Sequence, residues 1–199
     1  MYPAPIQSLV ELFAKFPGVG PRQAARFVFY MLGESAEFRT ALAQSITRIA
    51  DTLLVCVRCG NIEAKKDTQA HTCSVCRNAK RNMKQIAVVE DVTSLRALEQ
   101  TRTYAGVYHV LGKVFEKNTE EPETAQVKKL ITRIGDENSE EIIIATSPTY
   151  EGDATARYIE QELKNCTVKI TRLARGLAKG VDIEYVDEET LRCALAGRH

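Results

Sequence analysis

Six cysteines are the residues of this sequence best suited to chemistry, and four of them form two close pairs. The pairs follow the spacing C-x2-C-x13-C-x2-C, and their members are Cys56, Cys59, Cys73 and Cys76. Each pair can close a tight turn around one ion, and four thiolates give Zn²⁺ a closed tetrahedral site that has no open position for catalysis. Gly60 stands where such a turn needs a flexible residue. The alternatives are two unrelated reduced pairs or a redox motif, but a redox motif does not occur twice in so short a stretch. We therefore predict one structural zinc ion per chain.

The remaining metal-ligating residue types have simpler interpretations. His71 could replace a cysteine ligand, but with four cysteines present we interpret it as a surface residue. Cys166 and Cys193 stand apart from the pairs, and we expect them to be buried small hydrophobic residues. The N-terminus, Met-Tyr-Pro-Ala-Pro, lacks the basic start and apolar core of a signal peptide, and the longest aliphatic runs have about four residues. We expect a cytoplasmic protein without a membrane span, in which paired cysteines indicate metal rather than disulfides.

The segment that contains the cysteine pairs is basic. Residues 56–85 hold seven Lys/Arg against Glu63 and Asp67, and four thiolates with one Zn²⁺ lower this balance by only two charges. Over the whole chain, residues 1–85 hold 12 Lys/Arg and 6 Asp/Glu, whereas residues 86–199 hold 15 and 20. The asymmetry indicates different partners for the two halves, although scattered surface charge would look similar. For the cysteine segment, contact with nucleic acid and a solvated basic face remain open alternatives.

A glycine-rich turn at 17–20, PGVG, separates two short amphipathic segments and predicts a helix-hairpin-helix. Gly18 and Gly20 allow positive φ and let a phosphate approach the backbone. Pro21 suits the first position of a helix, whose free N–H groups and dipole attract an anion. Arg22 and Arg26 are four residues apart, so both project beside that site. Such a unit grips DNA phosphates without reading bases. A helical hairpin that merely needs a tight turn is the alternative.

Three acidic residues follow two of the apolar runs that resemble buried strands. Glu90 comes directly after the run 86–89, and Glu151 and Asp153 come after 142–146. Residues just past the carboxyl ends of parallel strands converge on one crevice, where grouped carboxylates can hold Mg²⁺ through its waters. The alternative is that Glu151 and Asp153 only occupy the start of the next helix, where negative charge is favoured.

The hydrophobic periodicity predicts the elements that must position these residues. Stripes at helical spacing cover 6–16, the stretch after Pro21 up to Gly33, and 38–53. Beyond the cysteines, apolar runs at 86–89, 106–111, 142–146 and 168–173 alternate with helical patterns at 92–101, 124–134 and 154–163. This alternation predicts a mainly parallel sheet with right-handed crossovers. The fold class is therefore mixed α and α/β, with predicted domains at 1–54, 55–80, 81–173 and 174–199.

Several blocks, in this order, resemble the RecR family of bacterial recombination mediators. They are PGVGPRQAARF at 17–27, the four-cysteine segment, VVED at 88–91, GVYHVLG at 106–112, PTYEGDATA at 148–156 and TRLARGLAKGVDIEYVDEETLRCALAGR at 171–198. The resemblance covers essentially the whole chain. Two departures are a longer gap between the cysteine pairs and a changed loop at 113–117.

The resemblance implies a helix-hairpin-helix, a zinc finger, a Toprim domain and a short C-terminal segment. It further implies a non-enzymatic protein that forms a ring-shaped tetramer, binds DNA, RecO and RecF, and promotes loading of RecA at single-stranded gaps. By motif, Gly18, Gly20, Arg22 and Arg26 would contact DNA, and Glu90, Glu151 and Asp153 would occupy the Toprim acidic positions, associated here with RecO contact. The main alternative is a small Mg²⁺-dependent Toprim nuclease, because fold alone does not determine activity. Whether Mg²⁺ binds at the acidic positions stays open.

Overall fold

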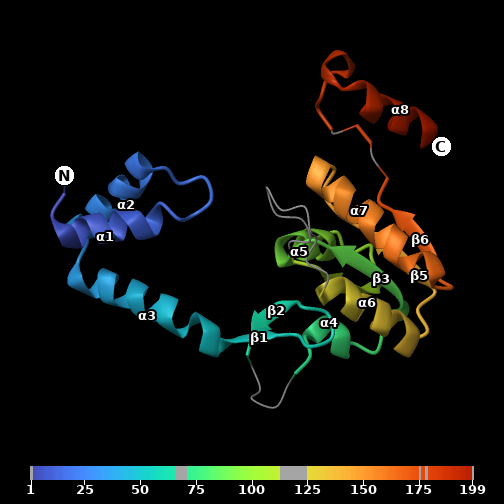
Figure 1. Ribbon diagram of the computed structural model, residues 1–199, viewed down its shortest axis with the longest axis horizontal. Helices are drawn as coiled ribbons and strands as arrows, with labels where there is room; N and C mark the ends of the chain where they lie inside the picture. The colour runs from blue at the N-terminus through green and yellow to red at the C-terminus, as the bar shows by residue number, and fades with distance from the viewer. Residues whose placement is uncertain (1, 66–70, 113–124, 175, 178, 199) are drawn as a thin grey trace. The chain divides into compact units, whose positions relative to one another are not determined.

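The computed structural model describes residues 2–65, 71–112, 125–174, 176–177 and 179–198 (Figure 1). Part of the longer loop between the cysteine pairs and the changed loop at 113–117 therefore lie outside the described residues. The chain divides into two compact units, Met1–Leu53 and Leu54–His199, and each is described by itself.

The N-terminal unit consists of three helices, as the periodicity predicts. They are α1 (Ala4–Phe13), α2 (Pro21–Gly33) and α3 (Ala36–Thr52). Pro21 begins α2, where its missing N–H is not needed, and the Ser35 side chain caps α3 by accepting a hydrogen bond from Phe38 N at 3.1 Å. α1 and α2 pack on each other around a small core that includes Val10, Ala24 and Val28.

Most apolar side chains of this unit are not covered by its own core. α3 has no buried residue over its 17 positions, and Ile46 and Ile49 are more than half exposed. Leu12 and Phe16, in and after α1, are also exposed. The core of this unit therefore contributes little stability, because apolar burial is the main favourable term in folding.

The second unit begins with the cysteine segment. It contains the short strands β1 (Leu53–Val55, which starts at the last residue of the first unit) and β2 (Ile62–Ala64), paired in a two-stranded sheet, and the one-turn helix α4 (Ser74–Arg77). Glu63 fixes the start of α4, because its carboxylate accepts hydrogen bonds from Ser74 N at 2.9 Å and Ser74 Oγ at 2.6 Å.

A four-stranded parallel sheet forms the centre of the second unit. Its strands are β3 (Asn82–Val89), β4 (Gly106–Val110), β5 (Glu141–Ile144) and β6 (Lys169–Arg172), in the order β4-β3-β5-β6. All three neighbouring pairs are parallel, with Ile142 aligned to Ile86 on one side and Ile170 on the other. The predicted fold class is confirmed. The strands read as continuous apolar runs because helices cover both faces of such a sheet.

The helices of this unit are crossover connections between the strands. They are α5 (Val92–Gln100), α6 (Ala125–Asp136) and α7 (Tyr150–Glu162), and α6 and α7 contact each other (Figure 1). A turn of 3-10 helix (Leu163–Asn165) extends α7. After β6, the chain forms a second such turn (Ile183–Tyr185) and the helix α8 (Glu188–Ala196). The expectation that Cys166 and Cys193 are buried is wrong, since both are partly exposed and Cys193 lies on α8, which has no buried residue.

Candidate metal centre and nucleic-acid interface

The four paired cysteines meet at one point. Their Sγ atoms all lie within 4.8 Å of one another, all four residues are buried, and the Sγ atoms of Cys59 and Cys73 are 3.5 Å apart. A tetrahedral Zn²⁺ with Zn–S bonds of about 2.3 Å separates its sulfurs by about 3.8 Å. The described geometry therefore fits a four-thiolate zinc site, and all four positions of the tetrahedron are supplied by protein.

The local backbone shows why the C-x-x-C-G sequence builds half of this site. Gly60 has φ of +77°, which permits the turn that returns Gly60 N to the Cys56 carbonyl at 2.9 Å. Asn61 N donates to Cys59 Sγ at 3.4 Å, so a backbone dipole faces a sulfur that would carry negative charge. The hydrogen bond from Cys59 lowers the pKa of the Cys56 thiol, whereas the same contact raises the pKa of Cys59. A metal that binds here must displace the protons of the thiols, so its affinity depends on pH.

The cysteine segment packs against the four-stranded sheet and is hydrogen-bonded to the elements around it. Val110 N, at the end of β4, donates to the Cys59 carbonyl at 2.8 Å. Arg58 donates through Nε to Glu137 at 2.7 Å and through Nη1 to the Cys76 carbonyl at 3.2 Å. The cysteines belong to the same hydrophobic cluster as the strands of the sheet. The metal ligands therefore share one core with the four-stranded sheet.

Ion pairs neutralise part of the positive charge of the cysteine segment. Arg58 pairs with Glu137, and Arg81 pairs with Glu99 at 2.5 Å. Lys84 pairs with Glu140, although both of those side chains are more than half exposed. These pairs engage three of the seven Lys/Arg of residues 56–85, so both a solvated basic face and a nucleic-acid contact remain compatible with this segment. His71 is exposed and does not belong to the cysteine cluster.

The hairpin of the N-terminal unit offers open backbone donors. Gly18 has φ of +78°, while Gly20 is extended and precedes α2 as its N-cap residue. No side chain caps the N-terminus of α2, and a Cβ at either glycine would meet no atom within 4 Å. The first N–H groups of α2 are therefore accessible to an anion, and the helix dipole favours one there.

Arg22 and Arg26 lie beside these donors and line one cleft. Among the residues that the structure describes, neither guanidinium pairs with a carboxylate, and Arg26 donates only a long hydrogen bond of 3.4 Å to Gln23. Two cations without acidic partners next to a free helix N-terminus form a surface suited to phosphate.

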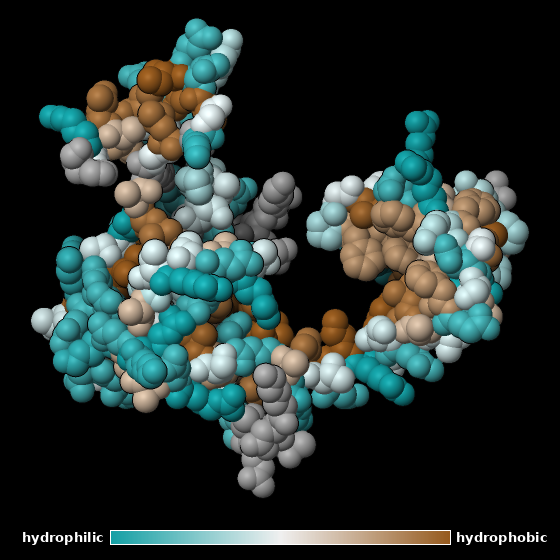
Figure 2. Space-filling view, turned by 180° about the vertical axis from the view of Figure 1, so that it is seen from behind, coloured by the Kyte–Doolittle hydropathy of each residue, from teal (hydrophilic) through white to brown (hydrophobic). Residues whose placement is uncertain are grey.

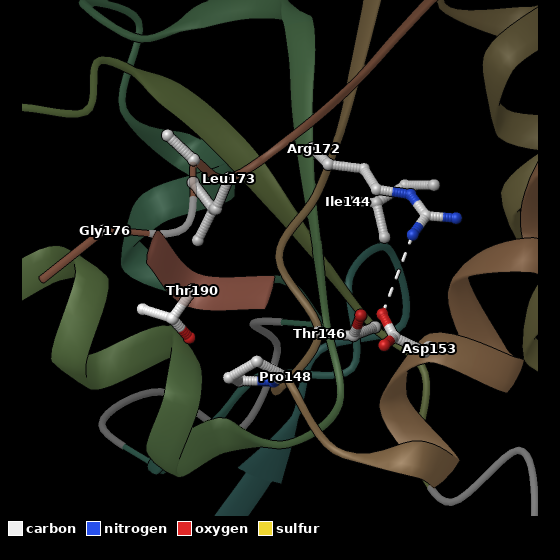
Figure 3. A pocket seen from close by; sticks show the side chains of 9 residues that line it. Ile144, Thr146, Pro148, Asp153, Arg172, Leu173, Gly176 and Thr190 are labelled. Carbon is white, nitrogen blue, oxygen red and sulfur yellow. Dashed lines mark ion pairs between the residues drawn. The ribbon is translucent and has the colours of Figure 1, made fainter. Parts of the chain in front are cut away.

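The three acidic positions lie near the carboxyl ends of β3 and β5. Glu90 accepts a hydrogen bond from Ser147 Oγ at 2.7 Å, and a Cβ on Gly152 would lie 3.0 Å from its Oε1. Asp153 points instead toward Arg172 on β6, with a carboxylate–guanidinium distance of 3.7 Å (Figure 3). Glu151 is exposed. Glu90 and the start of α7 are thus neighbours, but the two α7 acids point elsewhere.

These carboxylates do not form a converging ligand group. Within the described ranges, the four cysteines form the one group of three or more metal-ligating residues whose ligand atoms lie together. Thr149 is the N-cap of α7, accepting from Gly152 N at 3.1 Å, and Glu151 and Asp153 occupy the first turn. That placement matches the alternative in which these acids stabilise the start of the helix.

Comparison with known proteins places both units in one family. Residues 6–50 match the family model described as RecR, helix-hairpin-helix, and residues 84–174 match that of the Toprim domain. The chain is 42% identical to the recombination protein RecR of Herpetosiphon aurantiacus over 98% of this chain and 94% of that protein. It is 41% identical to RecR of Lactococcus lactis subsp. cremoris over 99% and 98% of the two chains, and 40% identical to RecR of Bifidobacterium adolescentis over 99% and 96%. The chain belongs to the RecR family. It is thus a recombination protein of that family, and its Toprim sheet is the four-stranded sheet β4-β3-β5-β6.

Two features of this RecR-family chain carry no signal in the sequence. Arg172 pairs with Asp153 and donates two hydrogen bonds to the carboxylate of Glu160, from Nε at 2.7 Å and from Nη2 at 2.8 Å. In the sequence it is one more basic residue in a run that predicts a strand. The contact of Arg58 with Glu137 joins residues 79 positions apart.

Among the described residues, no helix has the length and apolar character that a membrane crossing requires.

Proposed function

We propose that this RecR-family protein is a non-enzymatic recombination mediator that binds DNA without regard to sequence. The observation that carries the proposal is the hairpin surface, where the uncapped N-terminus of α2 adjoins Arg22 and Arg26 in one cleft. Gly18 and Gly20 leave room for a phosphate on this surface. None of these groups is placed to read base edges, so binding depends on charge and on salt.

The proposed cofactor is one structural Zn²⁺ held by Cys56, Cys59, Cys73 and Cys76. The mutual distances and the burial of the four sulfurs support it. When bound, the ion cross-links two turns of the chain, and a four-thiolate site is closed to substrate. Two backbone hydrogen bonds hold the first of these turns in position, from Gly60 N to the Cys56 carbonyl and from Asn61 N to Cys59 Sγ.

The acidic positions Glu90, Glu151 and Asp153 are proposed to contact a protein partner rather than to hold a catalytic metal. Asp153 already has the Arg172 guanidinium opposite it, so a cation is supplied by the chain. Glu151 is exposed, and Glu90 accepts from Ser147. The carboxylates are therefore not arranged as three ligands to one Mg²⁺, which weighs against the alternative of a Toprim nuclease.

The partners follow from family membership. We propose that the chain acts in the cytoplasm with RecO and RecF to promote RecA loading at single-stranded gaps. The uncovered apolar residues of α1 and α3 support self-association, for which a tetrameric ring is the proposed form. Several hairpins engaging one DNA would raise the affinity, because each protomer neutralises only a few phosphates.

The decisive experiment is a salt titration of DNA binding by the variant Arg22→Ala/Arg26→Ala on gapped DNA. The control is Arg48→Ala, which removes an exposed cation from α3 of the same unit. The double variant should bind every sequence more weakly and show a shallower dependence of log affinity on log salt, by about 0.7–0.9 for each phosphate that is no longer neutralised. Parent-like binding by the double variant would show that the hairpin is structural.

The non-enzymatic assignment has its own test. The protein is incubated with Mg²⁺ and labelled gapped DNA, with Glu90→Ala in parallel. The proposal expects intact DNA strands for both proteins. Nicks that depend on Mg²⁺ and disappear with Glu90→Ala would establish the nuclease instead.

A further inference from the structure

Aromatic side chains line the same cleft as the two hairpin arginines. Beside Arg22 and Arg26, the cleft wall contains Tyr2, Phe27, Phe29 and Tyr30. These four rings are between 37% and 62% exposed, which is unusual for side chains that gain most from burial. Figure 2 shows apolar side chains gathered on the visible face of the N-terminal unit, with hydrophilic ones around them.

Along α2, the two arginines come before the aromatic residues. Arg22, Arg26 and Tyr30 follow each other at intervals of four, so they lie on one ridge of the helix. At 1.5 Å per residue, Tyr30 is about 12 Å along the helix from Arg22. That distance spans roughly three to four base steps of a DNA strand at 3.4 Å per step.

Contacts within the unit hold the exposed rings in position. Tyr2 and Phe29 are in edge contact, with centroids 5.3 Å apart, and Tyr30 meets Phe38 of α3 in the same manner at 6.4 Å. Rings that are already oriented lose little conformational entropy when a ligand stacks on them. The cleft therefore combines two mobile cations with a comparatively fixed aromatic surface.

We infer that this cleft binds unpaired nucleotides of a DNA strand, with phosphates at Arg22 and Arg26 and a base stacked on the aromatic surface at Tyr30. Single-strand binding surfaces combine a basic track with aromatic rings in this way, and stacking tolerates every base. The inference rests on the proposed function and extends it, because the hairpin alone would not distinguish paired from unpaired DNA. Bases inside a duplex are already stacked on one another, so only unpaired bases gain from the rings.

The charges in the cleft favour nucleic acid over an apolar protein face. A protein surface that covered the rings would also desolvate Arg22 and Arg26, which have no carboxylate partner among the described residues. Burying an unpaired cation costs several kcal/mol, whereas DNA brings a phosphate for each. A second copy of this chain is the competing occupant, and fluorescence from the cleft distinguishes it from DNA.

The affinity test compares Tyr30→Ala with Tyr150→Ala, which removes an exposed tyrosine of the same kind from α7 in the second unit. Tyr30 is 62% exposed, so its removal leaves the core of the unit intact. Tyr30→Ala should weaken binding of single-stranded and gapped DNA about fivefold or more, and leave binding of blunt duplex nearly unchanged. Equal losses of affinity for single-stranded DNA and duplex, or no loss for either, would overturn the inference.

A fluorescence test uses the absence of tryptophan from the chain. Tyr30→Trp places a single reporter in the cleft, and Tyr150→Trp, on α7 of the second unit, is the control. Single-stranded DNA should quench the emission of the Tyr30→Trp variant, and an abasic strand of the same length should not, because it carries the phosphates without bases. Equal quenching by both strands would overturn base stacking. An emission change that follows protein concentration without DNA would overturn the inference as well, because a second copy would then cover the cleft.

The two proposals fail separately in these assays. If Arg22→Ala/Arg26→Ala binds DNA more weakly but Tyr30→Ala keeps the parent's preference for single-stranded over duplex DNA, only the stacking is refuted. Parent-like binding by the double arginine variant refutes the hairpin itself.

Discussion

The partly buried carboxylate of Glu137 joins the cysteine segment to α6, and its removal should destabilise the second unit strongly. Its Oε1 accepts from Arg58 Nε at 2.7 Å and from Arg133 Nε at 2.9 Å. Arg133 is only 6% exposed and also donates to the Tyr108 carbonyl at 2.6 Å. Burial alone would raise the pKa of Glu137, but the hydrogen bonds from Arg58 and Arg133 lower it below its usual value.

The expected magnitude follows from the burial of the partner. Glu137→Ala leaves the Arg133 guanidinium buried without a counter-charge, and removing one member of a buried pair costs about 3–5 kcal/mol. The matched control is Glu140→Ala, which breaks the exposed pair with Lys84. Because solvent screens that pair, its removal should cost less than about 1 kcal/mol.

Urea unfolding of the two variants, followed by circular dichroism at neutral pH, measures this difference. The unfolding midpoint of Glu137→Ala should fall well below that of Glu140→Ala, with a similar dependence on urea. A third variant, Arg133→Met/Glu137→Ala, removes the stranded charge and should recover part of the lost stability. Equal midpoints for Glu137→Ala and Glu140→Ala would refute the reasoning that burial makes this carboxylate essential.

Three further variants test other parts of the second unit. Gly152→Ala should cost about 1–3 kcal/mol, because its Cβ would lie 2.0 Å from a backbone carbonyl oxygen, whereas Gly135→Ala on α6 meets nothing within 4 Å and should be neutral or stabilising in thermal melts. Burial lowers the pKa of His109 to about 4, while an unfolded histidine titrates near 6.5. The unfolded state therefore binds the proton more tightly. As the pH falls from 6.5 to 4, the free energy of unfolding should fall by up to about 1.4 kcal/mol for each pH unit. A His109→Phe variant that keeps this pH dependence would contradict the assignment. Cys59→Ser should abolish bound zinc in elemental analysis, and Cys193→Ser should retain one ion per chain; purified parent protein without zinc would refute the site.

Periodicity and spacing were sufficient for the architecture. Helical stripes located α1 to α3, and apolar runs located the four strands of the parallel sheet, because strands covered on both faces leave little room for polar residues. The short strands β1 and β2 beside the cysteines were not predicted. The C-x2-C pairs located the metal cluster, since two turns with four sulfurs have few other arrangements. Local chemistry within a few residues determined each of these features.

Long-range side-chain partners could not be derived in the same way. The strand order correctly brings Glu90 beside the loop that follows β5, but successive helical residues point about 100° apart. Asp153 therefore points to Arg172, and Glu151 to solvent. Cys166 and Cys193 were misjudged because an isolated cysteine has no pattern around it, and the general tendency of cysteine toward burial was the only guide.

The turn at Cys59 and Gly60 contacts the end of β4, and this contact limits which segments can be exchanged between this protein and its relatives. The Gly60 backbone is left-handed, and a Cβ there would lie 3.2 Å from Val110 Cβ, while Val110 N donates to the Cys59 carbonyl. A chimera that borrows the cysteine segment of another RecR must therefore borrow a compatible end of β4 as well. The two stretches, far apart in the sequence, form one structural unit, so a larger side chain at either position would press on the other.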